Sequence, residues 1–257
     1  MRQFEGRAVM VTGASKGIGY ACAEAFVQAG AKVAIVSRSR DNLDAALARL
    51  GHGVVAIAAD MRVPSDAARA VDDAEAALGP LDVLVNSAGA AKRYAPAELN
   101  AQAWRDAIDA KFFSYIYATD IVVKRMAARG RGAIVNIIGM GGKVAHGSHL
   151  AGGSANAALM LATVGLAAVY GPQGVRVNGI NPGGTLTDRV QEGLNVESRM
   201  TGVSAEELLA RAQANVPLRR LATPEEIAKV TLFLASDDAS YVTGALVPMD
   251  GGTASVV

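Results

Sequence analysis

Residues 12–19 read Thr-Gly-Ala-Ser-Lys-Gly-Ile-Gly, and they lie between a short apolar run, residues 8–12, and an alanine-rich helical pattern, residues 17–29. Glycine permits a tight turn and a close approach of the backbone to a pyrophosphate, which the free N–H groups of the following helix attract. The spacing is Gly-x-x-x-Gly-x-Gly rather than the commoner dinucleotide fingerprint, but the strand-turn-helix setting is the required one. The stretch therefore predicts a phosphate-binding turn.

Short apolar runs alternate with longer helical patterns along the rest of the chain. Because the runs are continuous rather than alternating, the strands are expected to be covered on both faces. This order predicts an α/β fold with a single Rossmann-type, doubly wound parallel sheet and right-handed crossovers. We expect strands at residues 8–12, 32–36, 54–58, 82–85, 133–138 and 175–180, and helices at residues 17–29, 41–50, 64–78, 104–129 and 154–170.

No linker or internal repeat divides the chain, so residues 1–257 are expected to form one domain. The one irregular stretch runs from about residue 183 to 216 and contains a helical pattern at residues 205–214. Insertions of this kind often act as lids over a site. The stretch mixes apolar and charged side chains, which indicates a small, partly apolar organic substrate.

Composition excludes several classes of protein. The chain has 257 residues, of which 51% are hydrophobic, so intrinsic disorder is not expected. Its 25 Lys and Arg residues nearly balance 24 Asp and Glu residues, without the basic excess of a nucleic-acid binder. The single cysteine, Cys22, allows no intrachain disulfide and no cysteine-based metal site. A charged start and a longest apolar stretch, residues 155–170, too short for a bilayer favour a cytoplasmic protein without a membrane span.

Further motifs follow in order along the chain. They are Asn86-Ser-Ala-Gly89, Asn181-Pro-Gly183, and a C-terminal run from Pro217-Leu-Arg-Arg to Met249-Asp-Gly-Gly252. With these motifs the chain resembles the classical short-chain dehydrogenase/reductase superfamily and is similar to its beta-ketoacyl-carrier-protein reductases. The resemblance covers essentially the whole chain. It implies an oxidoreductase acting on a carbonyl or alcohol, and a homodimer or homotetramer built on the helices at residues 104–129 and 154–170.

The same resemblance implies contacts with a nicotinamide dinucleotide. The residues implied along the phosphates are Gly13, Ser15, Lys16, Gly17, Ile18 and Gly19. Those implied at the adenine and its ribose are Asp60, Met61, Asn86, Ala88 and Gly89. Those implied at the nicotinamide end are Pro182, Gly183, Thr185 and Thr187.

The residues after the second expected strand address the choice of cofactor. They read Ser37-Arg38-Ser39-Arg40 and include no acidic residue that could accept the ribose 2′-hydroxyl. Arg38, helped by Lys16, offers positive charge where a 2′-phosphate would lie. We therefore expect NADP(H) rather than NAD(H); the alternative is that both are ordinary solvated basic side chains.

The resemblance does not extend to the catalytic residues. Superfamily members usually carry Asn, Ser, Tyr and Lys at four places, which fall here on Lys111, Gly139, Gly152 and Asn156. Counting forward from the strand at residues 133–138 and back from residues 175–178 both lead to Gly152. The sequence therefore predicts an oxidoreductase with non-standard catalytic residues.

One hypothesis is that the chemistry has moved to neighbouring side chains. Lys111 could direct its amine toward the space of the missing lysine, and Asn156 could bind the nicotinamide ribose as a neutral substitute. His149 would donate the proton, since an unperturbed imidazole pKa of about 6.5 suits proton transfer near neutral pH. A subset of the superfamily has a similar Asn-Ala-Ala-Leu segment with Tyr at the place of His149. His146 and Tyr94 are further pocket candidates, and packing or surface roles remain the alternatives for all of these residues.

Two other hypotheses stay open. The protein could be a nucleotide-binding pseudoenzyme, as a partner subunit or sensor, or it could catalyse a non-redox isomerisation or dehydration in the same pocket. Nicotinamide turnover would distinguish a redox enzyme from both. The glycines at residues 139, 141, 142, 147, 152 and 153 suggest open volume beside the nicotinamide, which a bulkier substrate could fill.

Overall fold

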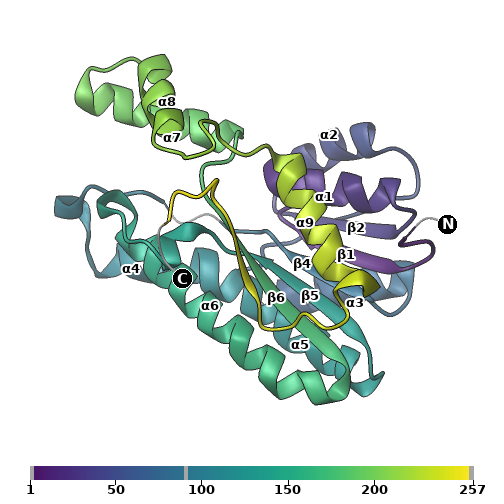
Figure 1. The fold of residues 1–257 in the computed structure, drawn as a ribbon. Coiled ribbons are helices and arrows are strands. Elements are labelled where there is room, and N and C mark those ends of the chain that lie inside the picture. The colour runs from purple at the N-terminus through teal and green to yellow at the C-terminus, as the bar shows by residue number, and fades with distance from the viewer. Residues whose placement is uncertain (1–2, 90–91, 255–257) are drawn as a thin grey trace.

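A computed structural model describes residues 3–89 and 92–254. Its strands form one seven-stranded sheet in the order β3-β2-β1-β4-β5-β6-β7, and every pair of neighbours is parallel (Figure 1). The strand order reverses at β1, which pairs with both β2 and β4, so the doubly wound Rossmann-type fold is confirmed. The strands are β1 Ala8–Thr12, β2 Lys32–Ser37, β3 Val55–Ala58, β4 Val83–Asn86, β5 Gly132–Ile137, β6 Val175–Pro182 and β7 Leu246–Met249.

Helices cover both faces of the sheet (Figure 1). On one face lie α1 Gly17–Gln28, α2 Arg40–Leu50 and α9 Pro224–Ala235; on the other lie α3 Pro64–Leu78, α5 Ser114–Ala128 and α6 Leu150–Tyr170. Successive side chains of β1 illustrate the reason for the continuous apolar runs. Val9 and Val11 pack under the first helical layer, while Met10 packs under the second. Each face thus has its own core.

Two expectations about single elements need correction. The helix expected at residues 104–129 is interrupted: α4 Ala101–Ala107 leads into a π-helical turn, Ile108–Phe113, before α5 begins. Such turns insert one extra residue and frequently occur at functional sites. The apolar pattern also did not predict the last strand, β7, which lies at the edge of the sheet beside β6.

Helix α6 begins four residues before its expected start and is the most apolar helix described. The expectation that its apolar stretch is too short for a bilayer needs correction, because the helical segment at residues 147–173 is long and apolar enough to cross a membrane by length and composition alone; 39% of its most apolar window is buried inside the protein. The helix packs along β6 and against the loop that follows β5. Leu161, Val164 and Val169 remain exposed along it, so it is buried on fewer sides than its composition suggested.

The irregular stretch forms two helices that stand away from the sheet (Figure 1). Helix α8, Ala205–Ala214, confirms the expected helical pattern, and α7, Asp188–Thr201, was not expected. Ser204 caps α8 by accepting a hydrogen bond from the Glu207 backbone. At its other end the Arg219 guanidinium donates to the Ala214 carbonyl, although Arg219 itself has a φ of 56°, which is unfavourable for a residue with a side chain. The Arg219–Ala214 hydrogen bond links the C-terminal end of α8 to the residues that follow it.

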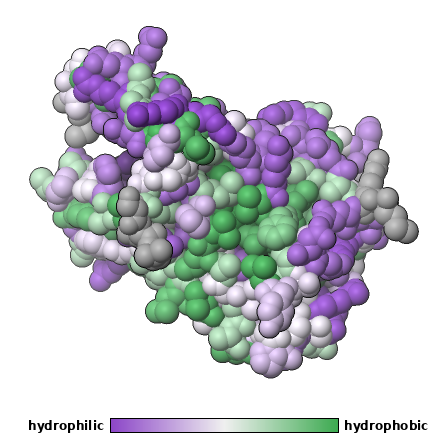
Figure 2. Space-filling model, in the orientation of Figure 1, coloured by the Kyte–Doolittle hydropathy of each residue, from purple (hydrophilic) through white to green (hydrophobic). Residues whose placement is uncertain are grey.

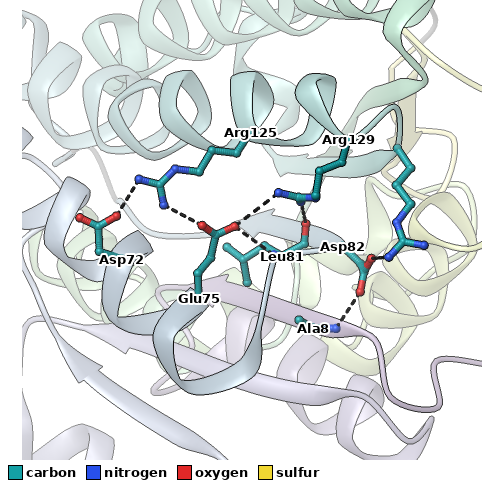
Figure 3. Close-up of polar contacts among 8 residues, drawn as sticks. Ala8, Asp72, Glu75, Leu81, Asp82, Arg125 and Arg129 are labelled. Carbon is teal, nitrogen blue, oxygen red and sulfur yellow. Dashed lines mark hydrogen bonds and ion pairs between the residues drawn. The ribbon is translucent and has the colours of Figure 1, made fainter.

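At the opposite, amino edge of the sheet, ion pairs join α3 to α5 (Figure 3). Arg125 donates to Asp72 at 2.6 Å and to Glu75 at 2.7 Å. The other Glu75 oxygen accepts from the Leu81 backbone, and Arg129 donates to the Leu81 carbonyl. The Glu75 side chain is 17% exposed, so this network is screened less than the ion pairs on the surface.

Glu75→Gln tests the contribution of this network to stability. The change removes the more buried of the two carboxylate partners of Arg125, while Asp72 remains, which should lower the free energy of unfolding by about 1 kcal/mol. For a chain of this size, that corresponds to a fall of about 2–4 °C in Tm by calorimetry. Asp44→Asn, in an exposed pair with Arg40, is the control and should shift Tm by less than about 1 °C. Equal shifts in the two variants would contradict a structural role for Glu75.

Candidate active site

The glycine-rich turn after β1 brings backbone against backbone. A Cβ on Gly19 would lie 2.4 Å from the Gly13 carbonyl oxygen, and one on Gly13 would lie 2.7 Å from the Ala88 Cα atom. Gly13 and Gly17 also have positive φ angles, 66° and 59°. Larger residues cannot occupy these positions without moving the backbone. The turn therefore leaves the start of α1 uncovered by side chains, at the carboxyl edge of the sheet where ligands bind in such folds.

Several polar and charged side chains lie around the end of β2, at this edge of the sheet. The Ser15 hydroxyl donates to Ser37 at 3.0 Å, which joins the glycine turn to the end of β2. Hydrogen bonds from Arg62 hold the pKa of Asp60 below its usual value, and the charge of Arg38 lowers it further. Arg38 is therefore close enough to Asp60 to act on it electrostatically. Ser15 and Arg38 thus both lie at the end of β2, and Lys16, the other residue expected at a 2′-phosphate, lies exposed at the start of α1.

Two expected cofactor contacts need correction at the level of their side chains. Asn86 is fully buried, and its amide donates to Thr119 at 2.8 Å and to Asn136 at 2.9 Å. Met61 is 3% exposed and packs in the core beneath α3. Both side chains follow the alternation of the strand or turn that carries them and point into the protein. Only their backbone groups remain candidates for adenosine contacts.

The loop after β4 and the end of β6 lie on either side of the glycine turn. Gly89 has a φ of 104°, and a Cβ there would lie 2.0 Å from the Ala110 carbonyl oxygen, so the loop rests directly on the π-helical turn. At the other wall, a Cβ on Gly17 would meet the Thr187 methyl group at 3.5 Å. Thr185 is buried and bridges to Ala222. The start of the lid thus lies beside the phosphate turn.

Three candidate catalytic positions converge at the end of β5. A Cβ placed on Gly139 would lie 3.2 Å from the Asn156 amide nitrogen and 4.0 Å from the Pro182 carbonyl oxygen. One placed on Gly141 would lie 2.8 Å from the His149 ring and 3.4 Å from the same Asn156 nitrogen. Asn156 is 4% exposed, and its Oδ1 atom has no hydrogen-bond partner among the described residues. A buried amide oxygen without a donor indicates that a ligand group completes the site.

Lys111 takes part in a different contact from the one expected. Its buried amine donates to the Tyr115 hydroxyl at 2.7 Å and to the Ile137 carbonyl at 2.9 Å. Tyr115 donates to the same carbonyl at 2.6 Å. The amine therefore lies at the carboxyl end of β5, two residues before Gly139. Tyr115 was not among the residues that the sequence singled out; its i, i+4 spacing from Lys111 on a helix was the signal that linked them.

The expected open volume beside the nicotinamide is wrong at several of the glycines. A Cβ on Gly142 would lie 2.7 Å from the Met160 methyl group, and one on Gly153 would lie 2.6 Å from the Gly141 carbonyl oxygen. These glycines let the loop after β5 pack tightly on α6. Gly147, by contrast, has nothing within 4 Å of a Cβ.

The remaining candidates, Tyr94 and His146, lie beside Ser148, just before α6 begins. The Tyr94 backbone donates to the Ser148 carbonyl at 3.1 Å, and the exposed His146 ring is 3.0 Å from the Ser148 hydroxyl. Within residues 3–89 and 92–254, no three His, Cys, Asp or Glu side chains are grouped to hold a metal ion. Burial raises the pKa of the Cys22 thiol to about 12, so it stays protonated at neutral pH.

Comparison with known proteins identifies the family of this chain. The family model described as enoyl-(acyl carrier protein) reductase matches residues 13–254. The chain is 36% identical to cis-4-hydroxycyclohexanecarboxylate dehydrogenase of Sinomonas cyclohexanicum over 98% of each chain. It is also 30% identical to the 3-oxoacyl-[acyl-carrier-protein] reductase FabG of Escherichia coli over 97% of this chain and 98% of the relative. The chain belongs to the short-chain dehydrogenase/reductase superfamily.

Because its relatives are named dehydrogenases and reductases, the superfamily assignment indicates an oxidoreductase. L-sorbose reductase of Gluconobacter frateurii, solved with NADPH and L-sorbose, superposes with a TM-score of 0.93 at 29% identity and full coverage of both chains. A further relative, 34% identical over 91% of this chain and the whole of its own length, is named inactive 2-(S)-hydroxypropyl-CoM dehydrogenase 2 of Xanthobacter autotrophicus. The relatives of this chain thus include proteins named as active dehydrogenases or reductases and one named as inactive.

Proposed function

We propose that this protein is an NADP(H)-dependent oxidoreductase that interconverts a carbonyl and an alcohol on a small, partly apolar organic substrate, using non-standard catalytic residues. The convergence of His149 and Asn156 on the loop at Gly139 and Gly141, at the carboxyl edge of the sheet, is the observation that carries this proposal. It supplies a proton donor and a ligand-binding amide at one point. The dehydrogenases and reductases among the relatives support the reaction class.

The residues present fit a nicotinamide dinucleotide. The glycine turn offers a cradle that a single Cβ would fill, and the Asn156 Oδ1 atom lacks a donor that a ribose hydroxyl can supply. Gly13, Ser15, Lys16, Gly17, Ile18 and Gly19 would hold the phosphates, and Pro182, Gly183, Thr185 and Thr187 the nicotinamide end. When bound, NADP(H) supplies or accepts the hydride. Preference for NADP(H) is supported by Arg38, which follows the Ser37 that Ser15 contacts, and by the NADPH in the L-sorbose reductase structure.

Arg38→Gln tests cofactor choice. We expect the wild type to bind NADPH more tightly than NADH, as followed by nicotinamide fluorescence and calorimetry. Because hydrogen bonds to a charged group contribute about 1.5–3 kcal/mol, the variant should weaken NADPH binding by about 10- to 100-fold and remove the preference. Arg40→Gln, whose arginine pairs with Asp44 on α2, is the matched control. Equal dissociation constants for NADPH and NADH in the wild type would overturn the assignment.

The side chains divide the remaining work as follows. In the reductive direction His149, as imidazolium, would give its proton to the substrate oxygen, and the hydride would come from the bound NADPH, so that the C=O π bond is replaced by one C–H and one O–H bond while the C–O single bond remains. In the oxidative direction neutral His149 takes that proton back. Asn156 accepts a hydrogen bond through Oδ1 and orients its ligand. The buried Lys111 amine, hydrogen-bonded to Tyr115 and to the Ile137 carbonyl, holds the end of β5 in place beside this site.

Substitution of His149 tests the proton step. General acid–base catalysis typically contributes about 10²- to 10⁴-fold, so His149→Gln should lower kcat by that order while leaving the affinity for NADPH intact. In the oxidative direction, where neutral His149 is the base, the acidic limb of the pH profile of kcat should disappear in the variant. His149→Tyr restores an ionisable donor and should regain activity with a limb at higher pH. His52→Gln, at an exposed loop residue, is the control. An unchanged pH profile in His149→Gln would show that another group moves the proton.

A second candidate function is a nucleotide-binding pseudoenzyme. Glycine at residues 139 and 152, where the superfamily usually has Ser and Tyr, favours it, as does the relative whose name calls it inactive. A partner subunit or sensor of this kind would bind NADPH without turning it over. A non-redox isomerase or dehydratase in the same pocket would also show no nicotinamide turnover, but it would convert its substrate.

We also propose that the protein is cytoplasmic and forms a homodimer or homotetramer. Figure 2 shows apolar residues across the middle of the face on which α6, α9 and β7 lie. Leu161 is 76% exposed and Val169 is 62% exposed on α6, which is unusual for large apolar side chains so close together. Light scattering should give a mass of two or four chains, and Leu161→Glu should reduce it. A monomeric wild type would contradict this assembly.

A further inference from the structure

Charge is distributed unevenly between the two edges of the sheet. The chain has no Asp or Glu between Asp120 and Asp188, and none between Asp82 and Glu98. These two segments supply the loops that follow β5 and β4, both at the edge that carries His149 and Asn156. The acidic side chains of the ion-pair network lie at the opposite edge (Figure 3). A net charge of only +1 therefore conceals an excess of positive charge around the candidate active site.

Two side chains meet at the Ser148 hydroxyl, immediately before His149. Arg93 donates to this hydroxyl at 3.2 Å, and the His146 Nδ1 atom lies 3.0 Å from it. The Lys92 amine lies 5.1 Å from the centre of the Tyr94 ring, and the Tyr94 backbone donates a hydrogen bond to the Ser148 carbonyl. We call Lys92 and Arg93, which His146 borders, the cationic rim. Ser148 fixes the rim one residue away from the proposed proton donor.

The cationic rim has no acidic partner within the described part of the chain. Neither Lys92 nor Arg93 takes part in any of its ion pairs, in contrast to Arg125 and Arg220, which each pair with carboxylates. Within residues 3–89 and 92–254, the hydrogen bond of the Arg93 side chain goes to a neutral hydroxyl, so most of its five N–H donors are available for a ligand. A guanidinium fork of this kind matches the two oxygens of a carboxylate.

We propose that the cationic rim binds a carboxylate of the substrate, so that the oxidoreductase acts on hydroxy acids and oxo acids. This inference rests on the proposed function, because the rim adjoins the His149 that would serve the reacting carbon. An apolar ring or chain between the carboxylate and the carbinol carbon then lies over the loop at Gly139 and Gly141. The relative named for cis-4-hydroxycyclohexanecarboxylate, a compound with a carboxylate, supports this class of substrate.

The first test measures binding without reaction. Cyclohexanecarboxylate has no carbonyl or hydroxyl on its ring to oxidise or reduce, and calorimetry follows its binding to the NADPH-loaded protein. We expect binding that weakens as salt is added, and about 10- to 100-fold weaker binding in Arg93→Gln, with Arg93→Lys intermediate. The neutral methyl ester should bind at least about 10-fold more weakly than the acid. Arg131→Gln, an exposed arginine at the amino edge, should bind the acid like the wild type.

The second test measures turnover of NADP⁺ with cis-4-hydroxycyclohexanecarboxylate and with its methyl ester. We expect a lower KM for the acid, and in Arg93→Gln a 10- to 100-fold rise in that KM, so that the preference for the acid is lost. Folding of each variant is checked by its Tm and by its affinity for NADPH.

The two tests separate the two proposals. Binding of the carboxylate that depends on Arg93, without any turnover, would support the cationic rim and contradict the proposed oxidoreductase function. Equal turnover of acid and ester, or binding unaffected by Arg93→Gln, would overturn the rim and leave the oxidoreductase standing. Absence of both carboxylate binding and turnover would overturn the rim and the proposed function together.

Discussion

The close approach of β1 and β4 at their carboxyl ends is the constraint on which the rest of the site depends. The Gly13 backbone lies against Ala88, and Gly19 lies against Gly13, with no room for a side chain at either glycine. Thr12 secures this approach, because its hydroxyl accepts from the Ser87 and Ala88 backbone N–H groups. The contact directs α1 away from the sheet edge with its N-terminus open, and it fixes where a dinucleotide can lie.

A buried chain of hydrogen bonds extends this constraint to the catalytic side. Asn86 on β4 donates to Asn136 on β5, and Asn136 donates to Thr163 on α6 at 2.9 Å. Thr163 is seven residues after Asn156, two turns along the same face of the helix. The polar network thus fixes the rotation of α6 relative to the sheet, and with it the position of Asn156 beside Gly139. Since every member is buried, a lost bond would be costly.

The fold was predictable from the sequence because continuous apolar strands and capped helices give local, periodic signals. The helix at residues 64–78 matches its expected bounds, and strand ends differ by one or two residues. Side-chain direction was harder to predict. Asn86 and Met61 lie in motifs associated with the cofactor, but tertiary packing turns both side chains inward. The edge strand β7 lacked a signal because its side chains are only partly buried.

The candidate site was predictable in composition but not in contacts. Counting along the chain led to residues 139 and 156, and the resemblance to a subset of the superfamily led to His149; these three positions do converge. The π-helical turn could not be foreseen, since one extra residue in a helix leaves little trace in an apolar pattern. That turn carries Lys111, whose amine donates to Tyr115 instead of extending toward the position of the missing lysine. The glycines likewise signalled tight packing of a loop on α6 as readily as open volume.

The most direct test of the account is a crystal structure of the protein with NADP⁺ and cis-4-hydroxycyclohexanecarboxylate. We expect the Asn156 Oδ1 atom to lie within hydrogen-bond distance of the nicotinamide ribose. We expect His149 to lie within about 2.6–3.2 Å of the substrate hydroxyl, or to reach it through one water. A bound dinucleotide whose ribose lies away from Asn156, with His149 turned out of the pocket, would contradict the claim that these residues rebuild the catalytic centre.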